Sequence, residues 1–343
     1  MRLLIITQKI DISDDNLGFF HRWVEEFAKN TEEIFVIANF AGEYHLPAKV
    51  KIFSLGKEKG FGRIRRYFNF FRYLLKILPK SDAVFVHMIP AWVAMGWPFY
   101  KIFRKKVYLW YTHKSVTFSL RLAEKIVERI FTASEKSFRL PSQKVKILGH
   151  GIDLEKFKPS SEFETRSLRF RIITAGRISR SKNLRLLIEA AAVLKNKGFD
   201  FEVRIAGAPI FAVDNQYLQR LKDLVIKNNL ENIVKFSGAI PYAEIEKFYQ
   251  KGDLFVNLSA TGSLDKSVLE AMACGVNILV SNEAFFGLLP EENFVQNLSG
   301  ENIAARIKFF MDNKKTDNNL REIVVKNHNL KELIENILKY FQE

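Results

Sequence analysis

Two basic residues stand where an apolar strand is expected to give way to a helix. Arg177 and Lys182 follow the expected strand Arg169–Ala175, with Gly176 directly after the strand. Glycine lets a backbone turn sharply and approach a ligand closely. Two cations fixed at the end of a strand can neutralise a diphosphate, both at rest and as charge builds on a leaving group. Asn183 is expected to be the N-cap of the helix that follows.

A second group of polar residues lies in a loop and a short helix. The apolar run Leu254–Leu258 ends in small residues, and a helix capped by Ser263 or Asp265 is expected to end at Gly275. The carboxyl end of such a strand is where open α/β sheets bind ligands, and the helix start favours an anion such as phosphate. Glu270 points away from the apolar face of this helix, so the residues alone favour a solvated glutamate.

Both groups match a known family. The segment Gly262–Gly275 resembles the carboxyl-half signature of the group 1 (GT4-type) retaining glycosyltransferases, which have the GT-B fold. The loop Gly176–Asn183, about ninety residues earlier, is similar to that family's diphosphate-binding loop. In that family the glutamate matching Glu270 holds the nucleotide ribose, and the loop before it holds the donor sugar and diphosphate. The resemblance implies a donor-binding set of Gly176, Arg177, Lys182, Leu264, Asp265, Lys266 and Glu270.

One position departs from the family pattern. The family has two glutamates eight positions apart, and the earlier one is replaced here by Gly262, while its usual Phe-Gly is replaced by Leu264-Asp265. Three explanations are open: a subfamily in which Asp265 and Lys266 serve the sugar, an altered donor, or an inactive homologue. The first is favoured, because the positions that match the diphosphate and ribose contacts are all retained.

A histidine follows a strand in the first half of the chain. His113 comes directly after the apolar run Val107–Thr112. Taken alone, a histidine in this setting is more often a satisfied core or surface residue than a catalytic one. The resemblance implies instead a histidine that contacts the donor sugar near its C6 hydroxyl. The expected catalytic group is therefore His113 with Arg177 and Lys182.

The loop after the first strand, Asp11–Gly18, carries three aspartates and a single glycine. Family members often have several glycines here, whose amides approach the diphosphate and the acceptor; this chain retains Gly18. Three aspartates suggest a metal site, but their spacing is wrong for one and the setting is a Rossmann-like first turn. No metal is expected, and Asp14 or Asp15 is expected to orient an acceptor hydroxyl.

The order of apolar runs predicts an α/β fold with two domains. Strands alternate with helices through residues 1–158, and the alternation restarts after a linker, Lys158–Ser167, to cover residues 168–328. A chain of 343 residues with 48% hydrophobic content can form two cores. The resemblance implies GT-B architecture: two Rossmann-like, doubly wound parallel-sheet domains facing a cleft, the first for the acceptor and the second for the nucleotide sugar. It also implies that the last helix, 330–341, packs back on the first domain.

The formal net charge of +15 favours an anionic partner. The segment Gly60–Lys80 concentrates this charge, since six Arg or Lys residues alternate there with aromatics at helical spacing. Such a helix can lie in an anionic membrane interface, or it can be an ordinary helix with aromatics in the core and solvated cations; the sequence leaves both open. Nucleic acid is not an expected partner, because no recognised nucleic-acid module accompanies the charge.

Cysteine usage and hydropathy indicate a cytoplasmic location. Cys274 is the single cysteine, which excludes an internal disulfide framework. No run approaches the roughly 18 apolar residues of a membrane span, and the first residues resemble a strand rather than a signal peptide. We therefore expect a cytoplasmic protein, peripheral to the inner face of the cytoplasmic membrane if Gly60–Lys80 contacts lipid.

The resemblance implies a retaining, metal-independent glycosyltransferase that moves a sugar from a nucleoside diphosphate, UDP or GDP, to a hydroxyl. No cofactor besides the nucleotide-sugar substrate is expected. The acceptor is expected to be a lipid-linked or cell-surface glycan precursor, as in polysaccharide biosynthesis. The alternative is a non-catalytic homologue that binds sugar nucleotides or membranes.

Overall fold

The computed structural model describes residues 1–160, 169–260, 262–313 and 318–342. The chain divides into two compact units: unit 1 comprises Met1–Asp153 with His328–Glu343, and unit 2 comprises Leu154–Asn327. The expected linker Lys158–Ser167 lies, from residue 161 onward, outside the described residues. Each unit has a hydrophobic core of its own on a parallel sheet.

Unit 1 is built on a seven-stranded parallel sheet with the order β3-β2-β1-β4-β5-β6-β7. Its strands are β1 (Arg2–Ile10), β2 (Glu33–Ala41), β3 (Val50–Ser54), β4 (Ala83–His87), β5 (Lys106–Trp110), β6 (Arg129–Thr132) and β7 (Val145–Ile147). Successive residues of β1 enter opposite core clusters, Leu3 and Ile5 on one face and Leu4 and Ile6 on the other. Both faces are therefore covered, as parallel sheets require.

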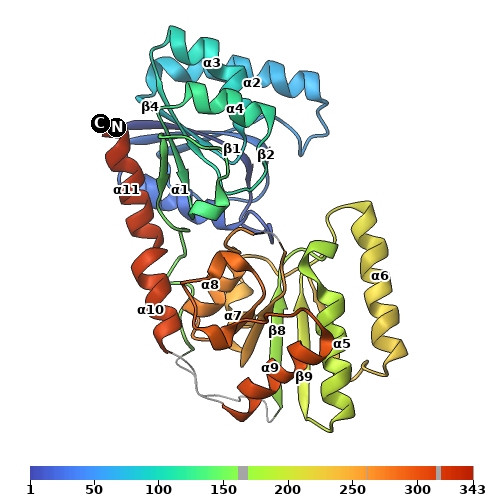
Figure 1. The fold of residues 1–343 in the computed structure, drawn as a ribbon. Coiled ribbons are helices and arrows are strands. Elements are labelled where there is room, and N and C mark those ends of the chain that lie inside the picture. The colour runs from blue at the N-terminus through green and yellow to red at the C-terminus, as the bar shows by residue number, and fades with distance from the viewer. Residues whose placement is uncertain (161–168, 261, 314–317, 343) are drawn as a thin grey trace. The chain divides into compact units, whose positions relative to one another are not determined.

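Two layers of helices cover this sheet. One face carries α1 (Phe19–Lys29) and α11 (Leu330–Gln342), and the other carries α2 (Arg63–Ile77), α3 (Pro90–Ile102) and α4 (Phe118–Ile126) (Figure 1). The last helix belongs to unit 1: its Leu333 and Ile337 are buried in the same cluster as β1. The Tyr108 hydroxyl also donates to the carbonyl of Tyr340 at 2.8 Å.

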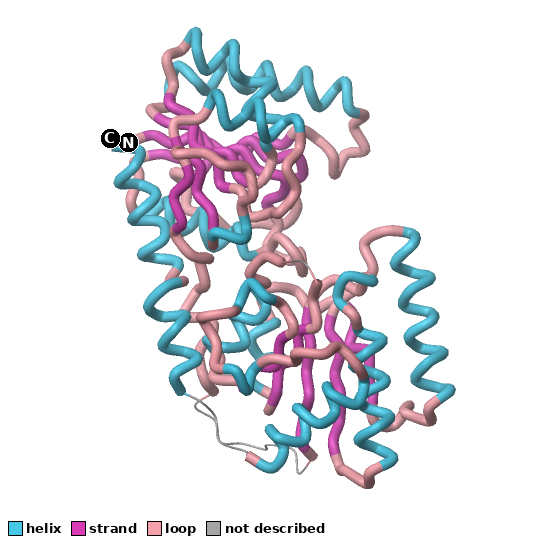
Figure 2. The backbone as a smooth tube through the Cα atoms, in the orientation of Figure 1, coloured by secondary structure: helices cyan, strands magenta, loops and turns pink. Residues whose placement is uncertain are grey.

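Unit 2 is built on a five-stranded parallel sheet with the order β10-β9-β8-β11-β12. The strands are β8 (Phe170–Ala175), β9 (Phe201–Ala206), β10 (Val234–Gly238), β11 (Leu254–Asn257) and β12 (Asn277–Val280). The helices, shown in cyan in Figure 2, are α5 (Leu184–Asn196), α6 (Ala212–Lys227), α7 (Ile245–Gln250), α8 (Lys266–Ala273), α9 (Gly300–Asp312) and α10 (Asn318–Asn327). The strand order reverses between β8 and β11, which is the point where ligands bind open α/β sheets.

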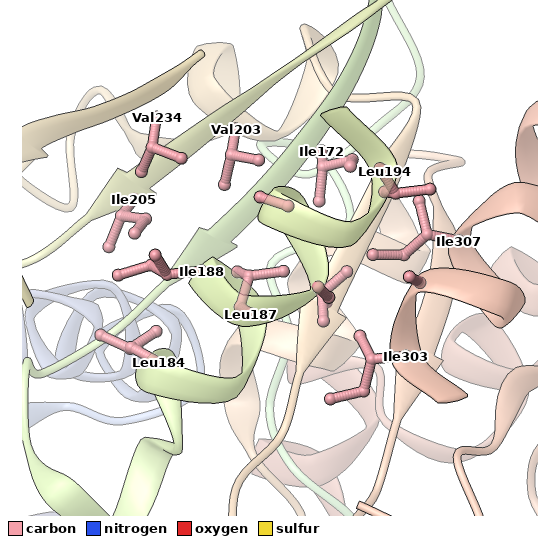
Figure 3. Packing of buried hydrophobic residues seen from close by; sticks show 14 of the residues in the cluster. Ile172, Leu184, Leu187, Ile188, Leu194, Val203, Ile205, Val234, Ile303 and Ile307 are labelled. Carbon is pink, nitrogen blue, oxygen red and sulfur yellow. The ribbon is translucent and has the colours of Figure 1, made fainter. Parts of the chain in front are cut away.

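The core of unit 2 lies between the sheet, α5 and α9. Figure 3 shows Val203 and Ile172 of the strands beside Leu187 of α5, with Ile303 and Ile307 of α9 next to that helix. Fully burying each of these side chains stabilises the fold by roughly 1.5–3 kcal/mol. The core fixes α5, and with it the loop that precedes α5.

The expected strands 107–112, 169–175 and 254–258 are confirmed as β5, β8 and β11. The helix α10 was not expected, because its sequence is mostly polar; it is held by buried Leu320 and Val324. Among the described residues, no helix is long and apolar enough to cross a membrane.

Candidate functional site

Three glycines end three neighbouring strands of unit 2. Gly176 follows β8, Gly207 follows β9 and Gly238 ends β10, with φ of 138°, 132° and 73°. A Cβ atom on Gly207 would lie 1.9 Å from the carbonyl oxygen of Gly176, so only glycine allows the two loops to approach this closely. Of the three, Gly176 was expected from the sequence to let the backbone approach a ligand. The signal for the other two is a glycine directly after each expected strand.

A small cavity opens at this edge of the sheet. Its lining includes Gly176, Arg177 and Lys182 from the loop after β8, and Asn257 and Leu258 at the end of β11. The cavity therefore lies at the reversal of strand order. The structure brings the two expected cations to one cavity at the expected edge of unit 2.

Lys182 is paired with an acidic residue from the second expected segment. Its Nζ lies 3.1 Å from Oδ1 of Asp265, and the two side chains are 18% and 14% exposed. The other carboxylate oxygen, Oδ2, is buried and has no hydrogen-bond partner among the described residues. Lys182 has three N–H donors, so it can hold Asp265 and still donate to a bound anion. Asp265 keeps an oxygen that can accept from a hydroxyl group.

The caps of the two helices differ from the expected mechanism. Asp265 occupies the N-cap position of α8, but its side chain makes no capping hydrogen bond. Asn183 occupies the N-cap position of α5 with φ of 50°, and its Nδ2 donates to the Leu258 carbonyl at 2.8 Å. Asn183 therefore joins the loop after β8 to the end of β11. The stop at Gly275 is confirmed, with φ of 76° after the last turn of α8.

Glu270 is buried, so its interpretation as a solvated glutamate is wrong. It is 6% exposed, and the hydroxyl of Tyr249 on α7 donates to its Oε2 at 3.0 Å. Burial raises the pKa of Glu270 to about 7, although the charges of Lys266 and Lys156 and the hydrogen bond from Tyr249 oppose the shift. The α8 sequence does not reveal this burial, because α7 supplies the cover and the partner. A carboxyl group of this kind can accept hydrogen bonds strongly once it is ionised.

The backbone at Gly262 disfavours a glutamate at that position. Its φ is 65°, the left-handed region that costs other residues roughly 1–2 kcal/mol. The adjoining loop is held by Asn282, whose Nδ2 donates to the Ser263 carbonyl at 2.7 Å. The loop of this chain is therefore built around glycine at the position where the family pattern has its first glutamate.

Two aromatic rings lie beside cations of this edge. The guanidinium of Arg177 is 5.9 Å from the ring centre of Phe211, and Lys266 Nζ is 5.8 Å from the ring centre of Tyr242. Contacts of this length restrict the cations without consuming their hydrogen-bond donors. Leu264 is buried in the loop before α8, whereas Asp265 and Lys266 are half-buried.

The loop after β1 in unit 1 holds the expected acceptor-side residues. The carboxylate of Asp14 pairs with Lys9 and accepts from the backbone N–H groups of Asn16 and Leu17, the latter two at 2.9 and 2.6 Å. Burial alone would raise the pKa of Asp14, but Lys9 and these amides outweigh it and lower that pKa. Asp14 therefore organises its own loop.

Asp15 and Gly18 differ from Asp14 in surroundings. Asp15 is largely exposed. The pKa of its carboxyl is nevertheless raised, because neighbouring atoms remove part of its solvent and because the charge of Asp14 lies close by. Gly18 is buried and precedes α1 as its N-cap. Of the two aspartates, Asp15 is the more exposed. Among the described residues, no cluster of three or more His, Cys, Asp or Glu could hold a metal ion.

His113 is exposed on the loop after β5. The backbone N–H of Ser115 donates to its Nδ1 at 3.1 Å, so a neutral ring carries its proton on Nε2. All strands of this sheet are parallel, and β4 alone separates β1 from β5. His113 and the loop after β1 therefore lie on the same edge of the unit 1 sheet. Nε2 is the atom that can donate to a ligand hydroxyl.

Comparison with known proteins identifies the family to which the chain belongs. Residues 155–327, about half of the chain, match the family model described as glycosyl transferases group 1. The match coincides with unit 2, which carries the glycine row, both cations and Glu270.

The chain is also similar to individual curated proteins. It is 28% identical over 145 residues to the putative colanic acid biosynthesis glycosyltransferase WcaL of Escherichia coli, which covers 40% of this chain and 34% of that protein. It is 29% identical over 147 residues to the D-inositol 3-phosphate glycosyltransferase of Paenarthrobacter aurescens, covering 40% and 35% of the two chains. The chain therefore spans about a third of the length of the curated relatives it matches.

Solved structures resemble the whole chain. Anabaena Alr3699/HepE in complex with UDP and glucose aligns with a TM-score of 0.80 and 17% identity, covering 99% of both chains. Sucrose-phosphate synthase of Thermosynechococcus elongatus aligns with a TM-score of 0.75 and 15% identity, covering 98% of both. At such low identity the likeness establishes the fold, and the expected α/β fold class with GT-B architecture is confirmed.

Proposed function

Because the chain belongs to the group 1 glycosyl transferases, we propose that it is an enzyme that moves a sugar from a nucleoside diphosphate to an acceptor hydroxyl. The observation that carries the proposal is the edge of unit 2, where Arg177 and Lys182 line one cavity and Lys182 contacts Asp265 at the start of α8. This edge combines fixed cations with a helix N-terminus. Both favour a diphosphate.

The donor in this proposal is a UDP- or GDP-linked sugar. UDP is the first candidate, because the Anabaena protein of the same fold was solved with UDP and with UDP-glucose. Gly176, Gly207 and Gly238 would let the nucleotide approach the backbone, since they leave the strand ends without side chains. Glu270 would accept hydrogen bonds from the ribose hydroxyls. Asp265, with its unpaired Oδ2, and Lys266 would serve the sugar in place of the glutamate that Gly262 replaces.

The proposed reaction retains the configuration of the sugar and uses no metal. As the bond from the sugar to the diphosphate breaks, positive charge grows on the sugar and negative charge grows on the leaving phosphate. Arg177, Lys182 and the start of α8 would stabilise the leaving phosphate, which takes the proton of the acceptor hydroxyl. On the unit 1 side, Nε2 of His113 would donate to a sugar hydroxyl, and Asp15 with the amides near Gly18 would orient the acceptor.

The acceptor in this proposal is a lipid-linked or cell-surface glycan precursor. It is motivated by relatives that are named for polysaccharide biosynthesis, such as WcaL and the amylovoran enzyme AmsK of Erwinia amylovora. We place the reaction in the cytoplasm, at the inner face of the cytoplasmic membrane, where Gly60–Lys80 would contact anionic lipid. A non-catalytic sugar-nucleotide-binding homologue is the alternative, and it is motivated by Gly262.

Nucleotide binding tests the proposal first. Thermal-shift measurements with UDP, GDP, ADP and CMP identify the base, because a ligand that binds only the folded state raises the melting temperature. Arg177→Ala should weaken the binding of the preferred diphosphate at least tenfold, since a hydrogen bond to a charged group contributes roughly 1.5–3 kcal/mol. Arg220→Ala, at an exposed position of α6, is the matched control and should bind as the wild type does.

Two outcomes separate the candidate functions. The proposal fails if no nucleotide stabilises the wild type, or if Arg177→Ala binds as tightly as Arg220→Ala. Sugar transfer from the preferred donor to a glycan acceptor then distinguishes an enzyme from a binding protein. Steady nucleotide binding with no transfer to any hydroxyl, and no donor hydrolysis, would favour the non-catalytic homologue.

A further inference from the structure

Three helices share one face of the unit 1 sheet. α2, α3 and α4 bury Phe70, Trp92 and Leu120 in a common core cluster, and Figure 1 shows the three helices as one layer. α1 and α11 pack on the opposite face in a separate cluster. The exposed residues and the charges of the two helix layers can therefore be compared, since both layers pack on the same sheet.

The outer side of the α2–α4 layer exposes large apolar side chains. Eight of the eighteen large apolar residues that are exposed in the described part of the chain lie on these helices: Ile64, Tyr67, Phe68, Leu75, Trp97, Ile102, Phe118 and Leu122. None of the eighteen lies on α1 or α11. Single exposed apolar residues are ordinary, whereas their concentration on one layer marks an interaction surface.

The exposed residues of α2 form an apolar stripe that the core does not use. At about 100° per residue, Ile64, Phe68 and Leu75 fall within about 40° of one another around the helix axis. The buried Phe70 and Ile77 lie more than about 100° from the centre of that stripe. Ile64 is 86% exposed and Phe68 is 67% exposed. Packing within unit 1 therefore does not explain these side chains.

The same layer concentrates positive charge. α2, α3 and α4 contain eight Lys or Arg residues and one carboxylate, Glu124. The α1 and α11 layer contains four Lys or Arg residues and four Glu residues, so it is balanced. Cations also lie against the aromatics of the layer: Lys101 Nζ is 5.6 Å from the ring centre of Trp97. The excess charge is therefore specific to the layer that exposes apolar residues.

We propose that the outer face of α2, α3 and α4 is a docking surface for an anionic lipid bilayer. Cations would meet the headgroup phosphates while the apolar side chains between them enter the region of the acyl chains. A nucleic acid would match the cations but offer no apolar partner to Ile64 or Ile102. A second copy of the chain would bring like charges together. The surface deepens the proposed function, since a bilayer would present a lipid-linked acceptor, but docking itself needs no donor.

Vesicle sedimentation tests the apolar stripe. The full chain should sediment with phosphatidylcholine vesicles that contain about 30% phosphatidylglycerol, and weakly with phosphatidylcholine alone. Ile64→Ser with Phe68→Ser should lower the partition coefficient at least tenfold. Val213→Ser with Ile226→Ser is the matched control, because these residues of α6 are 57% and 59% exposed. The control should bind as the wild type does.

Charge reversal tests the cations in the same assay. Arg65→Glu with Lys76→Glu should lower binding to the anionic vesicles at least tenfold, and added salt should weaken wild-type binding. Lys222→Glu with Lys227→Glu, at exposed positions of α6, makes the same change in net charge and should have a smaller effect. Equal losses in the two variants would show a general charge effect and would overturn the proposed surface.

Other results would also overturn the proposal. These are a wild type that does not bind anionic vesicles, a stripe variant that binds as well as the control, a wild-type dimer that the stripe variant dissociates, or oligonucleotide binding that displaces the vesicles. Tryptophan fluorescence of each variant confirms folding of unit 1, which holds all four tryptophans, and nucleotide thermal shifts confirm folding of unit 2; neither measurement involves lipid. Loss of vesicle binding with normal nucleotide binding supports the surface, and vesicle binding without nucleotide binding contradicts the proposed enzyme alone.

Discussion

The buried pair Glu270 and Tyr249 predicts a stability that depends on pH. The pKa of Glu270 is about 7 in the folded protein, against an ordinary value of 4.5. Between these values the folded state keeps a proton that the unfolded state has lost, so the free energy of unfolding falls as pH rises. Glu270→Gln cannot ionise. The variant should therefore gain stability relative to the wild type, by about 2.5 kcal/mol between pH 5 and pH 8.

The assay must follow unit 2 separately. All four tryptophans, Trp23, Trp92, Trp97 and Trp110, lie in unit 1, so tryptophan fluorescence reports on unit 1. Urea titrations at pH 5 to 8 should be followed by far-ultraviolet circular dichroism, with the unit 1 transition assigned from fluorescence. Glu231→Gln, at an exposed position of unit 2, is the matched control. Other titrating groups cancel in the comparison of each variant with the wild type.

The pH dependence of the variant tests whether Glu270 is buried in solution. A stability difference between Glu270→Gln and the wild type that stays constant from pH 5 to pH 8 would mean that Glu270 titrates as a solvated group. The burial of Glu270 beneath α7 would then be wrong. If the stability of Glu231→Gln relative to the wild type rose with pH as steeply as that of Glu270→Gln, the effect would not come from Glu270. A fluorescence transition that shifts with Glu270→Gln would assign the effect to unit 1.

Three further changes have defined outcomes. Gly207→Ala should lower the free energy of unfolding by more than about 3 kcal/mol, because its Cβ would clash with the carbonyl of Gly176. Gly198→Ala is the control, because Gly198 also has a positive φ but faces open space; it should lower the free energy of unfolding by about 1 kcal/mol in the same circular dichroism melts. Lys182→Ala should weaken diphosphate binding at least tenfold in calorimetry, whereas Asp265→Asn should keep or strengthen it; equal losses would contradict their opposite roles. Leu333→Ala should destabilise unit 1 by about 2–5 kcal/mol, measured by tryptophan fluorescence, if α11 holds that unit together.

The ion pair between Lys182 and Asp265 bears on how the proposed donor site would work. An acidic group beside a diphosphate would repel it, but the 3.1 Å contact neutralises Asp265 and positions Lys182 at the start of α8. Arrival of a phosphate would redistribute the donors of Lys182 between two anions. Asp265 would then turn its unpaired oxygen to a sugar hydroxyl, the role expected for it from the sequence.

The order of residues along the chain was enough to specify the elements and the edge at which polar residues gather. The stretches 254–258 and 169–175 are rich in apolar residues, are too short for helices and are followed by a small residue or glycine, so they indicate buried strands. Parallel strands with intervening helices place every loop that follows a strand on the same edge of the sheet. Arg177, Lys182 and Asp265 all follow such strands, so their positions in the sequence already assign them to one site, and the contact between Lys182 and Asp265 agrees.

The covered faces of the helices, by contrast, depend on the tertiary fold. The periodicity of α8 exposes Glu270, but α7 covers it and Tyr249 supplies the partner from 21 residues away. The sequence of α2 offers two apolar sides, and the sheet buries Phe70 and Ile77 while Ile64 and Phe68 remain outside. Helical periodicity specifies only which residues share a face. Whether a neighbouring element covers that face depends on contacts far apart in sequence, and these fix both the pKa of Glu270 and the surface of unit 1.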